Sequence, residues 1–393
     1  MWGKEYLTIF IILVTEVLGF SLILPFLPFF AQDLGASPIM IGLLFAVFPF
    51  FQLFSAPIMG KLSDHYGRKP LLIISQLATG ISFLVLGFSA ALWMIFLSRI
   101  IDGLLGSNFT IAQAYLSDIS TKKDRSIAFG VSGAAFGVGF LIGPGIGGWL
   151  AQYSYSLPSF LAASMSLVSI AMIVWFLPET VKRKQGRIKL DGIRLSEFSK
   201  YFRREKLSAS LWTFFTFILA HAIFVSMLAL YAERQLGLGP ANVGLALTYV
   251  GLISIVIRGG LLPRMVKSFG EKRLQYIGVL AILAGLGISA FAGQWQVFLV
   301  GMTLFAFGSG VSRPVMMGDI SRRVSEKEQG AIMGVANSLG SFTGIIGPLM
   351  GGFLINYFFP GSVMLAGAVV MLFGLGMMLR NEEKHLREII LGR

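Results

Sequence analysis

Residues 143–148 read GPGIGG, and residues 347–352 read GPLMGG, an offset of 204 residues. Both strings lie in apolar surroundings. A glycine-rich phosphate-binding loop follows a strand of a soluble sheet, and no such strand precedes these strings. Two further short matches recur in the same order at offsets of 201 and 202: residues 118–120 (DIS) with 319–321, and residues 106–107 (GS) with 308–309. Three ordered matches at nearly one spacing predict that the chain consists of two repeated halves.

The composition around these repeats is that of a membrane protein. Hydrophobic residues make up 55% of the 393 positions, and charged residues only 13%, against about 25% in soluble domains. Apolar runs of ~20 residues are long enough to cross a bilayer as helices. The composition excludes a soluble enzyme, a disordered protein and a fibrous repeat, and predicts an all-α integral membrane protein.

Twelve apolar runs separated by polar turns predict twelve transmembrane helices in two pseudo-symmetric six-helix bundles. The expected domains are a bundle at 1–178, a basic cytoplasmic linker at 179–208, and a bundle with a short tail at 209–393. The first apolar run is too long for a signal-peptide core, so we expect it to be retained. The predicted spans are 6–30, 39–61, 71–89, 92–118, 127–151, 158–178, 209–232, 242–262, 275–293, 295–321, 331–356 and 360–380.

The basic residues predict the orientation. With the N-terminus inside, 28 of the 32 lysines and arginines fall on the cytoplasmic side, and Arg234 alone falls on the other. This asymmetry is typical of multi-pass proteins of the cell membrane and places both termini in the cytoplasm. The net charge of +13 is thereby explained without nucleic acid. The linker holds ten of these bases and is either a chain attracted to anionic lipid or a short amphipathic helix on the inner membrane surface.

The loop after the second span reads GKLSDHYGRK, Gly60 to Lys69. A carboxylate, a turn glycine and two bases can hold two helix ends together by charge-assisted hydrogen bonds. An ordinary positive-inside loop explains the bases, but not Asp64 or the glycines. The corresponding segment of the second half, Lys267 to Lys272, has no aspartate, so we expect a lock on one side only.

The fifth span carries GFLIGPGIGG, Gly139 to Gly148. Small residues four apart allow close helix approach, and a proline kinks the span. Close helix packing is the simplest function of this motif.

Taken together, these strings resemble the major facilitator superfamily of transporters, and especially its twelve-span drug:proton antiporters, the tetracycline and multidrug exporters. In that family the loop motif (Gly60, Asp64, Gly67, Arg68, Lys69) locks an inner gate with an acid at the position of Asp118, and the antiporter motif corresponds to Gly139, Gly143, Pro144, Gly147 and Gly148. Three further strings share the resemblance: EVLGFSLILPFLP at 16–28, LSRIIDG at 97–103 and GVSRP at 310–314.

Charged residues within the spans are functional candidates, because each costs ~3 kcal/mol or more at the bilayer centre. Glu16 and Asp102 each lie ten residues from the start of their predicted spans, about 15 Å deep at 1.5 Å per residue. We expect them to exchange protons, with Arg99 tuning Asp102; a permanent Arg99–Asp102 ion pair is the alternative.

The expected substrate-binding residues are Glu16, Asn108, Gln113, His221 and Arg313. His221 can equally be a packing residue, and Arg313 a partner of an acid. Arg258 is expected to snorkel toward the membrane surface. Related exporters often have an acid in the seventh helix, and none occurs here before Glu233. That departure argues against strongly cationic substrates.

The sequence therefore predicts a monomeric, proton-coupled exporter of small amphiphilic compounds, surrounded by membrane lipid and driven by the proton gradient, with no cofactor and no metal. Zero cysteines exclude thiolate sites, and no Walker loop is present for ATP hydrolysis. Uptake of a sugar or organic acid by the same fold is the first alternative. A membrane enzyme and a receptor that retains the fold are more remote.

Overall fold

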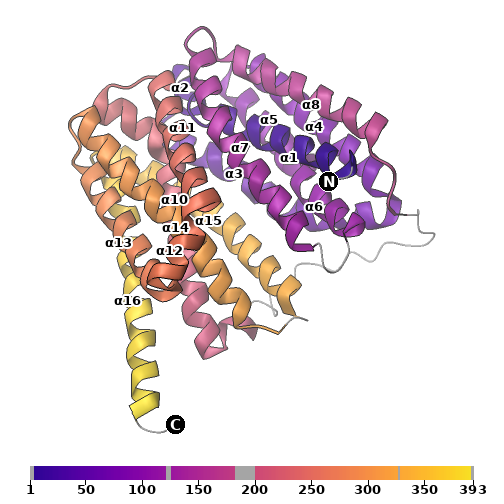
Figure 1. Cartoon of the computed structure of the whole chain (residues 1–393). Helices are drawn as coiled ribbons and strands as arrows, with labels where there is room; N and C mark the ends of the chain where they lie inside the picture. The colour runs from indigo at the N-terminus through magenta and orange to yellow at the C-terminus, as the bar shows by residue number, and fades with distance from the viewer. Residues whose placement is uncertain (1–3, 121–124, 182–199, 326–327, 391–393) are drawn as a thin grey trace. The chain divides into compact units, whose positions relative to one another are not determined.

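The computed structural model describes residues 4–120, 125–181, 200–325 and 328–390 (Figure 1). Within these residues, twelve helices are long and apolar enough to cross a membrane. The predicted all-α membrane fold is confirmed. Most of the predicted basic linker, 182–199, lies outside the described residues.

The helices group into two compact units. The first combines Met1–Ile193 with Leu238–Tyr249, and the second combines Arg194–Gly237 with Val250–Arg393. The boundaries predicted for the two bundles and the linker remain a prediction.

The first unit contains the helices of the first six spans. α1 packs closely on α7 and α8, and α4 packs on α5 and α8. The bounds are α1 Lys4–Ile23, α2 Leu27–Asp33, α3 Pro38–Tyr66, α4 Arg68–Gly87, α5 Leu92–Leu105, α6 Asn108–Ile119, α7 Arg125–Ala151 and α8 Ser156–Phe176.

The second unit contains the last six spans, apart from the beginning of the eighth. α13 packs on α14, and α10 packs on α15 and α16. The bounds are α10 Glu205–Leu236, α11 Pro240–Val256, the π-helix η1 Ile257–Leu261, α12 Leu262–Phe269, α13 Glu271–Ala290, α14 Trp295–Arg322, α15 Gln329–Tyr357 and α16 Ser362–Ile390.

Three spans predicted as continuous helices are interrupted. The first breaks in a turn at 24–26, where Pro25 and Pro28 disfavour a straight helix. The fourth breaks between α5 and α6 at Gly106-Ser107, two poor helix formers. The eighth widens into η1 at Arg258-Gly259-Gly260. The last two interruptions fall beside charged residues that the sequence places within predicted spans.

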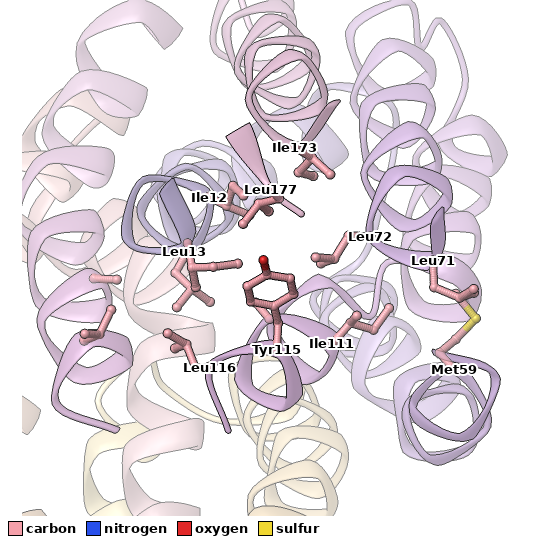
Figure 2. Close-up of a cluster of buried hydrophobic side chains, with 14 residues drawn as sticks. Ile12, Leu13, Met59, Leu71, Leu72, Ile111, Tyr115, Leu116, Ile173 and Leu177 are labelled. Carbon is pink, nitrogen blue, oxygen red and sulfur yellow. The ribbon is translucent and has the colours of Figure 1, made fainter. Parts of the chain in front are cut away.

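The core of the first unit is built around Tyr115 (Figure 2). Its ring lies among aliphatic side chains of α1, α4 and α8, including Leu13, Leu72 and Ile173. The Tyr115 hydroxyl donates to the carbonyl oxygen of Pro178 at 2.9 Å, so this buried tyrosine keeps a hydrogen-bond partner in apolar surroundings. The core therefore holds the C-terminal ends of α6 and α8 together, next to the predicted gate.

Candidate functional site

A hydrogen-bonded chain joins the two carboxyl groups inside the first unit. The Asn108 amide donates to Glu16 Oε2 at 2.9 Å and to Thr79 Oγ1 at 3.0 Å. The Thr79 hydroxyl in turn donates to Asp102 Oδ1 at 2.9 Å. Four helices supply these side chains: α1, α4, α5 and α6. We refer to Glu16, Asn108, Thr79 and Asp102 as the carboxyl chain.

The two ends of the carboxyl chain differ in exposure. Glu16 is half-buried, and Gln76 Nε2 approaches its Oε2 at 3.5 Å. Asp102 is only 6% exposed. Glu16 is therefore the less buried end of the carboxyl chain, and Asp102 is the interior end.

Arg99 holds the interior end of the carboxyl chain. Its Nη1 lies 3.8 Å from Asp102 Oδ2, and its Nε and Nη2 donate to Ser98 and Ser82, each at 3.2 Å. The guanidinium also lies 5.5 Å from the centre of the Phe83 ring. The cluster contains two carboxyl groups and one arginine. The single positive charge of Arg99 therefore neutralises one ionised carboxylate, and not both at once.

The break in the fourth span makes room for the carboxyl chain. A Cβ at Gly106 would lie 2.5 Å from the backbone oxygen of Asp102 and 2.9 Å from Thr79 Oγ1. Both distances are shorter than van der Waals contact, so position 106 requires glycine. The interruption also brings Asn108, the first residue of α6, within reach of α1 and α4.

The other predicted substrate-binding residues lie outside the carboxyl chain. Gln113 is half-buried in α6, five positions beyond Asn108, and forms no part of it. His221 and Arg313 belong to the second unit, on α10 and α14. Thr79 and Gln76 were missed, because a threonine and a glutamine in an apolar span carry no signal above ordinary packing.

The inner-gate residues assemble around Arg68, which is 6% exposed. Its guanidinium pairs with Asp64, donates to Asp118 Oδ2 at 2.9 Å and donates to Ser63 Oγ at 2.5 Å. The hydroxyl of Ser63 also donates to the carbonyl oxygen of Gly60 at 2.7 Å. The end of α3 and the start of α4 are thereby tied to the C-terminal end of α6.

Glu179 completes this gate and was not predicted. Its carboxylate accepts hydrogen bonds from the backbone N–H groups of Arg68 at 2.8 Å and Lys69 at 3.1 Å, so it caps the N-terminus of α4. Gly67 leaves room for it: φ is +112°, and an added Cβ would lie within 2.8 Å of the Glu179 carboxyl carbon. The available signal was an acid directly after the sixth span, in an otherwise basic stretch.

The second unit has a similar turn in which an acid, in place of an arginine, follows the glycine; the expectation of a lock on one side only stays a prediction. Gly270 has φ +74° and ψ 152°, close to the ψ of 151° at Gly67. Glu271 follows it and pairs with Arg322 at the end of α14, while Arg323 Nε donates to Asp319 at 2.9 Å. The second half has no aspartate that corresponds to Asp64, but it has an acid, Glu271, one position after Gly270.

A separate ion pair ties the start of α10 to the residue before α15. Arg204 donates to both carboxylate oxygens of Glu328, at 2.5 and 3.1 Å. These hydrogen bonds lower the pKa of Glu328 to about 2. Glu328 is consequently ionised at any physiological pH, and this contact does not respond to protons.

The antiporter-motif glycines of α7 lie on two faces. Gly139, Gly143 and Gly147 contact α1 at Val17, Ser21 and Leu22, and the Ser21 hydroxyl donates to the Gly139 carbonyl at 2.9 Å. On the other face, Gly148 approaches the start of α11, where an added Cβ would lie 3.0 Å from the Cα of Gly244. Pro144 lies inside α7. These glycines permit helix contacts that any larger residue would prevent.

Comparison with known proteins agrees with the family resemblance of the sequence motifs. The chain matches the family model of the Major Facilitator Superfamily over residues 9–294 and 261–392. It is 30% identical over 376 residues to the tetracycline resistance protein, class H, of Pasteurella multocida, covering 94% of each chain. It is also 30% identical over 392 residues to multidrug resistance protein 2 of Bacillus subtilis, covering 97% of each.

A solved structure has the same fold. The human organic anion transporter MFSD10 (TETRAN) superposes with a TM-score of 0.73 at 20% identity, covering 96% of this chain and 100% of that one. At this identity the similarity concerns the fold alone.

Proposed function

Because the chain belongs to the major facilitator superfamily of transporters, we propose that it is a proton-coupled exporter of small amphiphilic compounds. The names of its relatives, which refer to tetracycline and multidrug resistance, support export over nutrient uptake. The same relatives give no support to a membrane enzyme or a non-transporting receptor.

The observation that carries the proposal is the carboxyl chain with its single arginine. When Asp102 is ionised and paired with Arg99, a second negative charge on Glu16 costs free energy in a desolvated site, so Glu16 holds a proton. When Glu16 faces water on one side, that proton can leave. Transport follows if substrate binding and protonation favour opposite orientations of the transporter.

The proposed setting is the cell membrane, with both termini in the cytoplasm, as the distribution of lysine and arginine indicates. In this orientation the Arg68 gate lies at the inner surface. The transporter works as a monomer in lipid. The proton gradient supplies the energy, so no cofactor or metal is required.

Purified protein in liposomes tests this function. With an acidic lumen and tetracycline or a dye outside, a proton-coupled exporter incorporated in the inverted orientation accumulates substrate and alkalinises the lumen. We expect both signals together, and both should vanish when a protonophore dissipates the gradient. Substrate flux that ignores the pH gradient would instead identify a facilitator.

Replacement of Thr79 by valine removes the hydrogen-bond donor to Asp102 while keeping the side-chain shape. Because one hydrogen bond of about 1.4 kcal/mol corresponds to a tenfold change, we expect coupled turnover to fall about tenfold, with its pH optimum displaced and the KM for substrate unchanged. Thr79→Ser retains the hydroxyl and should restore the wild-type pH profile. An unshifted profile in Thr79→Val would show that the hydroxyl only packs.

A further inference from the structure

The membrane region of the second unit carries positive charge without acids at the same depth. Arg258 lies in η1, and Arg313 lies in α14. They are 11 and 9 residues from the inner ends of their helices, which places both about 15 Å from those ends at 1.5 Å per residue. Among the described residues of this unit, every acid lies near the end of a membrane-spanning segment or beyond it: Glu205, Glu233, Glu271, Asp319, Glu328, Glu382, Glu383 and Glu388.

The two arginines lie on neighbouring elements. Ile257, directly before Arg258, packs in one apolar cluster with Val311 and Val315 of α14. A Cβ at Gly310, one turn before Arg313, would lie 3.3 Å from the Ile257 side chain. These packing contacts place Arg258 and Arg313 on adjacent stretches of η1 and α14.

Both arginine side chains are exposed, although each lies well inside a span. An arginine that faces lipid at this depth is unfavourable, so exposed arginines here face water or a polar ligand. The π-turn that holds Arg258 also supports a functional role, because single π-turns inside α-helices occur frequently at functional sites.

A histidine ring packs on the same helix that carries Arg313. The His221 ring stacks on Phe305 with ring centres 5.6 Å apart and an interplanar angle of 12°, and lies 6.2 Å from the Phe217 ring. The Nδ1 atom of His221 is buried and has no hydrogen-bond partner in the described structure. Phe305 and Phe217 are buried, at 1% and 3% exposed, so the half-buried His221 is the member of this cluster that a polar ligand can reach.

We infer that Arg258 and Arg313, with His221 of α10, form a subsite for the anionic group of the substrate, so that the preferred cargo is an amphiphile bearing a carboxylate or another delocalised negative charge. Guanidinium groups bind such groups through two parallel hydrogen bonds. The inference rests on the proposed function, because it specifies the substrate class of that exporter. It also gives Arg258 a role in place of the expected snorkelling.

Two xanthene dyes of opposite charge test the inference. Fluorescein is an anion at neutral pH and rhodamine 123 is a cation, and their ring systems are the same. We expect the purified protein to bind fluorescein at least tenfold more tightly than rhodamine 123 by fluorescence anisotropy. Equal affinity, or tighter binding of rhodamine 123, would overturn the anionic subsite.

Single charge removals locate the subsite. Arg258→Gln and Arg313→Gln should each weaken fluorescein binding by tenfold or more and leave rhodamine 123 binding unchanged or stronger. Arg313→Lys keeps the positive charge but not the planar guanidinium group, so it should lose less fluorescein affinity than Arg313→Gln. Arg264→Gln removes the same charge from an exposed position on α12 and should have no effect. Size-exclusion elution at the wild-type volume shows that each variant is folded.

The results separate this inference from the proposed function. Proton-coupled transport of rhodamine 123 without fluorescein binding would keep the exporter and overturn the anionic subsite. Fluorescein binding that depends on both arginines, without any proton-coupled flux, would keep the subsite and overturn the exporter. Fluorescein affinity unchanged in both glutamine variants would also overturn the subsite.

Discussion

Glu16→Gln is expected to abolish proton-coupled transport, lowering the coupled flux by at least about 100-fold, the lower range for loss of a proton-transfer group. The glutamine side chain still accepts a hydrogen bond from Asn108, which Glu16 now accepts at 2.9 Å. It cannot release or take up a proton. The Arg99–Asp102 pair is then left without the second carboxyl that distinguishes the two states of the cycle.

The measurement is substrate-dependent proton movement in liposomes, with wild-type protein and Glu16→Gln side by side. Substrate binding should persist in the variant, because the loss lies in coupling. Glu5→Gln makes the same change at the start of the same helix, outside the carboxyl chain, and should behave as wild type. Normal coupling in Glu16→Gln would remove Glu16 from the mechanism and leave Asp102 as the remaining carrier.

The second large effect is expected from Gly147→Ala. The added methyl group would meet the backbone carbonyl of Leu22 on α1, with the Leu22 Cα only 2.9 Å away. Since a backbone carbonyl cannot rotate aside as a side chain does, α1 and α7 must separate. Overpacking of this kind costs about 1–3 kcal/mol, so we expect a lower midpoint of thermal unfolding in detergent and reduced transport.

Gly133→Ala is the matched control for this substitution. It lies in the same helix, and an added Cβ there meets nothing within 4 Å. Both replacements gain the same helix propensity, about 1 kcal/mol, so their difference isolates the contact with α1. Equal unfolding midpoints for the two variants would show that the helices tolerate a methyl group at the interface.

The parts of the fold that depend on long, repeated signals could be predicted from sequence. Twelve apolar runs and the duplicated glycine motifs are spread over whole spans, so small errors at their ends do not matter. The interruptions at Gly106-Ser107 and at η1 could not be predicted. They depend on what two or three residues meet in neighbouring helices, and glycine in a membrane helix signals close packing as readily as a break.

The candidate site shows the same limit. Charges stand out in an apolar span, so Glu16, Arg99 and Asp102 were identifiable one by one. Thr79 was not, because a hydroxyl in a membrane helix commonly bonds its own backbone, as Thr15 does with the Ile12 carbonyl at 2.8 Å. What makes Thr79 part of the carboxyl chain is its place between two other helices, and no spacing within α4 encodes that.

The broken fourth span has a consequence for biogenesis. α5 and α6 have 14 and 12 residues, and each alone is shorter than the ~20 residues that cross a bilayer. Their combined span has a hydropathy of 1.2, the lowest of the twelve. Such a segment partitions poorly into lipid by itself, and the polar groups of its carboxyl chain find partners on α1 and α4. We therefore expect the newly made fourth span to stay beside the insertion machinery until the first and third spans are in place, so that the groups proposed to carry protons enter the membrane already hydrogen-bonded.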